Sequence, residues 1–131
     1  MTEYFDKCLV KYLELSGLTK LPAAQTPFLE ESKLPDDDFV QGGQLAHDAA
    51  SILMSFMWLA RMARWDLLRQ IGGLASCITR WSLANDKQLF RLACYISTSR
   101  DYKLTLQVGD PSSSWKLDVW TDSDIATLLV H

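Results

Sequence analysis

The sequence AASILMSFMWLA at residues 49–60 contains no charged residue and is the longest apolar stretch of the chain. Its large side chains, among them Ile52, Leu53 and Phe56, recur at helical spacing and cover nearly the whole circumference, which is typical of a buried helix. Asp48 precedes the stretch and can cap its first turn. Because about 20 apolar residues are needed to span a bilayer, the stretch predicts a buried central helix rather than a membrane span.

Two further helices are predicted after this stretch. Asp66 can begin the first of them, which contains the pair Gly72-Gly73. Each glycine inside a helix costs about 1 kcal/mol relative to alanine, so we expect a close helix–helix contact at this pair. Asn85 followed by Gln88 is typical of a capping box at the start of the next helix. Residues 47–100 are therefore predicted to form the helical core.

Two segments precede this core. Residues 1–17 have an amphipathic helical pattern, with Gly17 as a C-terminal stop. Residues 18–46 hold three of the four prolines and no sustained period, which predicts an irregular connector. Long irregular connectors are uncommon inside compact domains, so this one favours packing against a larger partner. We expect the acid run at residues 36–38 to be a solvated loop, because consecutive carboxylates do not converge on one metal ion.

After the core the pattern changes to a period of two residues. Tyr102–Val108 and Leu117–Thr121 alternate in polarity and are separated by the turn sequence GDPS, which predicts an antiparallel hairpin over residues 101–124. Residues 125–131 form an apolar tail. The predicted fold class is therefore α+β, mainly helical, with three to four helices packed as a small bundle and a C-terminal antiparallel β-hairpin.

The net charge of −3 over 131 residues conceals a segmented distribution. Residues 1–48 carry a charge of −5, residues 61–103 carry +5, and residues 104–131 carry −3. The mildly acidic total is not that of a protein that coats nucleic acid. The basic middle is the only segment whose charge favours a polyanion.

The three cysteines, Cys8, Cys77 and Cys94, are widely spaced. Their spacing supports neither a disulfide framework nor a zinc site, and we expect small buried thiols. The first residues, MTEYFDK, lack the basic start and apolar core of a secretory signal peptide. The predicted localisation is intracellular, either cytoplasmic or nuclear, without contact with a membrane.

Seven motifs occur in a fixed order: residues 11–17 (KYLELSG), 26–29 (TPFL), 60–68 (ARMARWDLL), 80–81 (RW), 89–96 (LFRLACYI), 101–104 (DYKL) and 120–124 (WTDSD). Their order and spacing resemble the C-terminal part of the reverse transcriptase of copia-type LTR retrotransposons, over about residues 5–126. In that family the polymerase thumb leads through a helical connection into the first strand of ribonuclease H. The resemblance implies a connection region of the Pol polyprotein.

The chain departs from the family pattern at three places. The family usually has Arg-Pro-Asp where this chain has Arg64-Trp65-Asp66. The family's strand motif, Asp-Ala-Asp, is followed by an aromatic residue and glycine, whereas Asp122-Ser123-Asp124 is followed by Ile125-Ala126. The polymerase palm, with its paired metal-binding aspartates, would lie upstream of these residues.

The resemblance also bears on catalysis. Ribonuclease H uses two metal ions held by several carboxylates, and Asp122 matches the first of these. The family's other acids would lie beyond His131, so we predict no catalysis, no metal site and no cofactor. His47 precedes a helix with no nucleophile tied to it, and Gly42-Gly43 lacks the pattern of a phosphate loop.

The basic middle supports two interpretations. Six arginines are distributed along its helices, accompanied by Lys87, Lys103, Trp65 and Trp81. Five of the arginines are candidate contacts to nucleic-acid phosphates, which position a polyanion without reading its sequence: Arg61, Arg64, Arg69, Arg80 and Arg91. The other interpretation is that these residues, with Arg100, are ordinary solvated positions that pair in part with Asp66, Asp86 and Asp101.

Two functional hypotheses follow from the sequence. The first is a non-catalytic fragment of a retrotransposon reverse transcriptase and ribonuclease H, with a structural role and some contact with nucleic-acid backbone. The second is a recycled interaction module or small subunit of a protein assembly. In both, a protein partner or neighbouring domains would cover the apolar tail, because an exposed apolar end promotes association.

Overall fold

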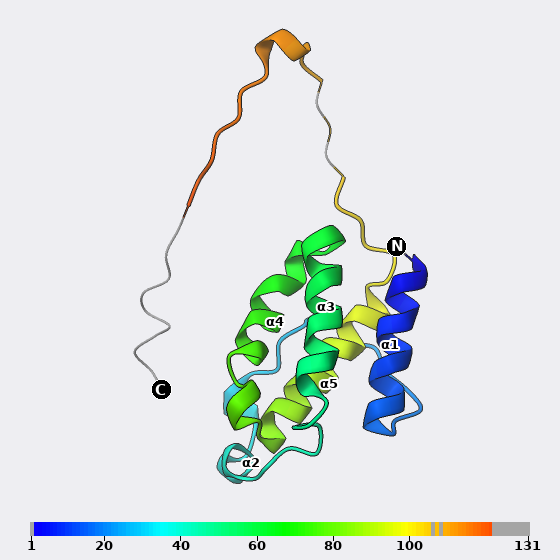
Figure 1. Cartoon of the computed structure of the whole chain (residues 1–131), viewed down its shortest axis with the longest axis vertical. Helices are drawn as coiled ribbons and strands as arrows, with labels where there is room; N and C mark the ends of the chain where they lie inside the picture. Colours follow the sequence, from blue (N-terminus) through cyan, green and yellow to red (C-terminus); the bar gives the residue numbers. More distant parts are fainter. Residues whose placement is uncertain (1, 106, 108, 122–131) are drawn as a thin grey trace.

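The computed structural model of the chain describes residues 2–105, 107 and 109–121. Within these residues five α-helices occur along the chain: α1 (Thr2–Ser16), α2 (Asp36–Val40), α3 (Ala49–Ala63), α4 (Leu68–Ala75) and α5 (Leu83–Thr98). Short 3-10 turns lie at Glu31–Lys33, Trp65–Leu67, Ile78–Arg80 and Ser112–Ser114. Residues 2–100 form a helical body in which α3 runs through the middle, with α1 and α4 on either side (Figure 1).

The core forms around α3, which confirms the buried central helix. Leu53, Phe56 and Leu59 of α3 have no exposed surface. The side chains that close over them come from every neighbouring long helix, and include Tyr12, Ile71, Leu89 and Leu92. None of the helices in the described part of the chain is both long and apolar enough to cross a membrane.

The predicted β-hairpin is wrong. The described residues after the helical body, which are 101–105, 107 and 109–121, contain no strand and are all exposed. They form what we call the C-terminal segment, which leaves the body as an extended chain broken by one 3-10 turn (Figure 1). An isolated hairpin is marginal in water without a core or a third strand to cover its apolar face, and the helices already cover one another. The end of the second predicted strand and the tail at residues 125–131 lie outside the described residues.

The connector contains a short α-helix, α2, that its sequence did not predict. The acid run at residues 36–38 forms the first turn of α2 and not a loop; Asp36 and Asp37 are exposed, whereas Asp38 is 6% exposed. Its carboxylate forms an ion pair with Lys87 of α5. Acidic side chains are favourable in the first turn of a helix, and the ion pair fastens the connector to α5.

The close approach predicted at Gly72-Gly73 occurs at a different glycine. A Cβ atom at Gly72 or at Gly73 would meet nothing within 4 Å. At Gly43 it would lie 2.6 Å from the Ser82 carbonyl oxygen and 2.6 Å from Cδ1 of Trp81. Gly43 therefore allows the connector to lie directly against the start of α5, where Gly42 and Ser82 form a β-bridge.

The capping box of α5 begins three residues earlier than predicted. Ser82 is the N-cap and its hydroxyl accepts a hydrogen bond from the Asn85 backbone N–H, while the Asn85 side chain accepts one from the Ser82 backbone N–H. Asn85 thus completes the box rather than starting it. The helix begins at Leu83.

Candidate functional site

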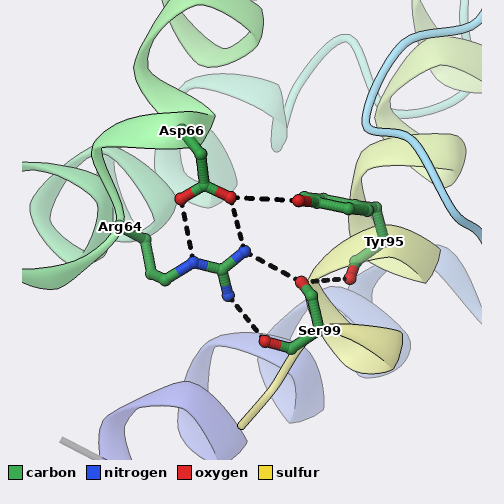
Figure 2. A network of polar contacts seen from close by, with 4 residues as sticks. All are labelled: Arg64, Asp66, Tyr95 and Ser99. Carbon is green, nitrogen blue, oxygen red and sulfur yellow. Dashed lines mark hydrogen bonds and ion pairs between the residues drawn. The ribbon is translucent and has the colours of Figure 1, made fainter. Parts of the chain in front are cut away.

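A buried arginine joins the α3–α4 corner to the end of α5. Arg64 follows α3 and is 3% exposed. Its guanidinium forms a forked pair with Asp66, with Nε 2.9 Å from Oδ1 and Nη2 2.7 Å from Oδ2 (Figure 2). The same group donates to the Ser99 carbonyl oxygen and to its hydroxyl, both at 2.9 Å. Four of the five guanidinium N–H groups are therefore engaged.

Aromatic rings enclose this guanidinium. Its central carbon lies 5.8 Å from the centre of the Phe5 ring, 5.7 Å from that of Tyr95 and 5.7 Å from that of Tyr102. Distances below about 6 Å allow cation–π attraction. Arg64 is thus a structural joint between α1, the α3–α4 corner and α5, and its charge is not presented to a ligand.

The charge of Arg64 changes the ionisation of its neighbours. Hydrogen bonds from Arg64 lower the pKa of the Asp66 carboxyl below its ordinary value, although partial burial opposes this. Tyr95 donates its hydroxyl to Oδ2 of Asp66 at 3.1 Å. Burial, followed by this bond to a carboxylate, raises the pKa of Tyr95. At neutral pH Asp66 is ionised and Tyr95 is neutral, so both hydrogen bonds persist.

A cavity of about 310 Å³ opens beside this network. Arg64, Asp66 and Tyr95 form one part of its lining. The remainder comes from Trp65 and from the start of the C-terminal segment, including Tyr102 and Lys103. The cavity thus combines the charge-paired network around the buried Arg64 with exposed aromatic side chains and one ammonium group.

The five candidate arginines do not form one surface. Arg61 and Arg69 are exposed and lie four residues before and after Trp65. Arg80 is exposed beyond the opposite end of α4. Arg91 is half-buried and donates from Nε and Nη2 to the carbonyl and hydroxyl oxygens of Thr26, both at 2.9 Å. Among the five, Arg61, Arg69 and Arg80 therefore are exposed, whereas Arg64 and Arg91 hold the fold together.

Arg100 and Trp81 also take part in contacts that hold the fold together. Arg100 pairs with Asp6 of α1 at 2.7 Å. Asp86 accepts the indole N–H of Trp81 at 2.7 Å and the backbone N–H groups of Gln44 and Leu45 at 2.6 and 3.2 Å. Of the acids proposed as arginine partners, Asp66 pairs with Arg64, whereas Asp86 binds N–H groups of the connector and of Trp81.

The other sequence candidates are His47, Asp122 and the three cysteines. Among the residues that the structure describes, no group of three His, Cys, Asp or Glu side chains is placed to hold a metal ion. His47 is exposed, and Asp122 lies outside the described residues. Cys8 and Cys94 are buried, and burial raises the pKa of both thiols. Cys77 is half-buried and free.

Sequence reasoning found Arg64 and Asp66 and allowed for a pair between them, but it did not find their contacts with Ser99, Tyr95 and Phe5. The i, i+2 spacing of an arginine and an acid is a usable signal for a forked pair. Ser99, Tyr95 and Phe5 carry no such signal, because their contacts depend on how distant helices pack. Comparison with protein-family models, with curated proteins and with solved structures gives no match to this chain.

Proposed function

We propose that the chain is a non-catalytic connection module derived from the Pol polyprotein of a copia-type LTR retrotransposon. It would hold a polymerase thumb and a ribonuclease H domain at a fixed spacing and touch nucleic-acid backbone between them. Support comes from the helical body, which places the residues 60–68 motif at a rigid corner locked by Arg64 and Asp66. The motif order in the sequence supports the same assignment.

The observation that carries the proposal is the state of residues 115–121. Trp115, Leu117 and Val119 alternate with polar residues and are 61, 90 and 73% exposed. Within the described part of the chain, no backbone hydrogen bond is found for residues 116–121. A segment of alternating β-forming residues whose backbone is exposed and unpaired can add to the edge of a sheet in another domain. A neighbouring ribonuclease H sheet would supply the missing strand partners.

The proposed role is positional. Arg61 and Arg69 would contact phosphates, which fix the register of a polyanion without reading bases. The helical body would have no catalytic role and would act as a spacer between two domains. Its α3–α4 corner is held to α5 by Arg64, which is buried and bonded to both Asp66 and Ser99.

The test uses the isotope-labelled chain and the ribonuclease H domain of a copia-type element from which the first strand has been deleted. We expect the amide signals of residues 116–121 to shift and become protected from hydrogen exchange on addition of the domain. Leu117→Lys should weaken the complex about tenfold or more, because burying a leucine contributes about 1.5–3 kcal/mol. Lys116→Thr, on the opposite strand face, is the matched control and should bind normally.

Unchanged signals for residues 116–121 in the presence of excess domain would overturn the proposal. Equal effects of Leu117→Lys and Lys116→Thr would also contradict it, because strand addition predicts that alternate faces differ. Transcripts that encode the chain provide a second test. We expect their reading frame to continue on both sides with palm and ribonuclease H motifs.

The second candidate function is a recycled interaction module, favoured by exposed tryptophans on the body as well as on the C-terminal segment. Trp58 and Trp65 are 49 and 58% exposed, and Trp120 is 91% exposed. Tryptophan is enriched at the centres of protein interfaces. A monodisperse monomer by sizing, with no partner recovered by crosslinking in cells, would count against this candidate.

A further inference from the structure

We infer that the cavity between Trp65 and Tyr102 binds one unpaired nucleotide of a single-stranded nucleic acid. The inference rests on the proposed contact with nucleic-acid backbone and names the form that it takes. The base would stack on the exposed aromatic rings, and the phosphates on either side of it would reach the surrounding cations. This arrangement makes the site one for a single strand and not for a duplex.

The two exposed rings are held in place before any ligand arrives. Trp65 is 58% exposed, and its indole N–H donates to the Arg61 carbonyl oxygen at 3.1 Å. Tyr102 is 60% exposed, its backbone N–H donates to the Ser99 carbonyl oxygen at 3.0 Å, and its ring interacts with the Arg64 guanidinium. Rings that are already ordered lose little entropy when a base stacks on them.

The charges around the cavity favour an anionic ligand. Lys103 lines the cavity, and Arg61 and Arg69 are exposed on either side of Trp65 in the sequence. The negative charge of Asp66 is compensated by Arg64, so it does not cancel these cations. Asp101 is the exposed acid nearest to Lys103 in the sequence and reduces the positive charge only in part.

The combination of exposed rings and cations at the site distinguishes between classes of anionic ligand. A duplex keeps its base faces stacked inside and presents only its backbone, so it can satisfy the cations but not the rings. An acidic peptide without aromatic side chains has the same shortcoming. A single strand offers both a free aromatic face and flanking phosphates, and it is therefore the class that matches both the exposed rings and the cation of the cavity.

The test is fluorescence anisotropy with a labelled oligothymidylate of about eight nucleotides and the whole chain in ~50 mM salt. We expect Trp65→Ala to weaken binding about tenfold, the size of one lost stacking contact. Trp65→Phe should restore most of the affinity, because phenylalanine keeps a ring for stacking. Trp115→Ala removes a tryptophan of similar exposure, 61%, outside the cavity and should have no effect.

A charge variant tests the second part of the site. Arg69→Gln should weaken oligothymidylate binding several-fold and reduce the slope of affinity against salt by about one phosphate contact. Its effect on binding of a blunt RNA–DNA hybrid should be similar, whereas Trp65→Ala should leave hybrid binding unchanged. This pattern separates the contribution of stacking from that of charge.

Three results would overturn the inference. These are no binding of oligothymidylate by the unmodified chain, equal losses from Trp65→Ala and Trp115→Ala, and competition by an acidic peptide as strong as that by the oligonucleotide. Each of them leaves the pairing of residues 116–121 with a ribonuclease H sheet untouched. Failure of the nucleotide site and failure of the proposed function can therefore be told apart.

Discussion

The helical body and the C-terminal segment both carry apolar residues at regular spacing, but only the body buries them. Leu53 in α3 has no exposed surface, whereas Leu117 in the C-terminal segment is 90% exposed. The body has periods close to 3.6 residues and the segment a period of two. The difference lies in where each kind of element finds its hydrogen-bond partners.

A helix satisfies its backbone within itself and needs neighbours only for its apolar stripe. A strand needs a second strand for its backbone and a covering layer for one face. The body supplies its helices with neighbours, since α1, α4 and α5 surround α3. In the described residues nothing pairs with residues 116–121, so a strand-like sequence remains extended and exposed.

The same substitution in the two regions should separate them most clearly. Leu53→Ala should lower the free energy of unfolding by about 3 kcal/mol, because it leaves a cavity in the core. Leu117→Ala should change it by no more than about 0.5 kcal/mol, because the side chain is surrounded by solvent. Urea titrations followed by circular dichroism measure both. Similar losses in the two variants would mean that the segment packs on the body.

A second matched pair uses glycines. Gly43→Ala should cost about 2 kcal/mol, since the new methyl group would lie 2.6 Å from the Ser82 carbonyl oxygen. Gly109→Ala, in the C-terminal segment, meets nothing within 4 Å and should be neutral. Thermal unfolding of both variants provides the measurement. A neutral Gly43→Ala would show that the connector does not lie tightly against α5.

The fold was predictable wherever helical periodicity was strong. The apolar stretch at residues 49–60 identifies the centre of the core, and Gly17 marks the end of α1 through its positive φ of 70°. The connector was less predictable, because α2 depends on the ion pair between Asp38 and Lys87, which are far apart in sequence. Gly43 was missed for the same reason. The prediction of a hairpin was wrong because alternating polarity shows that a segment can form a strand but not that a partner strand is present.

For the candidate site, the sequence predicted which segment is basic but not which of its residues are buried or lie together. The charge segmentation singled out the basic middle, but it could not distinguish Arg64, which is buried, from Arg61, which is exposed. Burial of a charge depends on acceptors brought in by other helices, here the backbone and hydroxyl of Ser99. The cavity itself needs Trp65 and Tyr102 from two separate elements, and no local pattern brings them together.

The acid dependence of stability tests the joint that holds the body together. Because Arg64 lowers the folded-state pKa of Asp66, ionised Asp66 stabilises the body above the unfolded pKa of about 4. That contribution should fade as the pH falls through and below this value. We expect Asp66→Asn to cost about 1 kcal/mol at neutral pH, a modest figure because solvent screens the half-exposed carboxylate.

Urea unfolding at several pH values between neutral and acidic measures this contribution. Asp66→Asn should flatten the acid limb of the stability curve relative to the unmodified chain. Asp118→Asn is the matched control, because Asp118 lies in the exposed C-terminal segment, and its curve should follow that of the unmodified chain. Equal flattening by both variants would mean that Asp66 contributes no more to the pH dependence of stability than an exposed aspartate does.

Removal of most of the C-terminal segment should change the free energy of unfolding least of all. A chain that ends at Leu104 loses the part of the C-terminal segment beyond the cavity but keeps Tyr102, Lys103 and Leu104, which line it. Its free energy of unfolding should match that of the whole chain within about 0.5 kcal/mol, because the removed described residues bury nothing against the helices. The denaturant m-value should fall little as well, since it reflects surface exposed on unfolding. A loss of several kcal/mol would show that residues beyond Leu104 cover the body, and residues 116–121 would then need no external sheet to cover them.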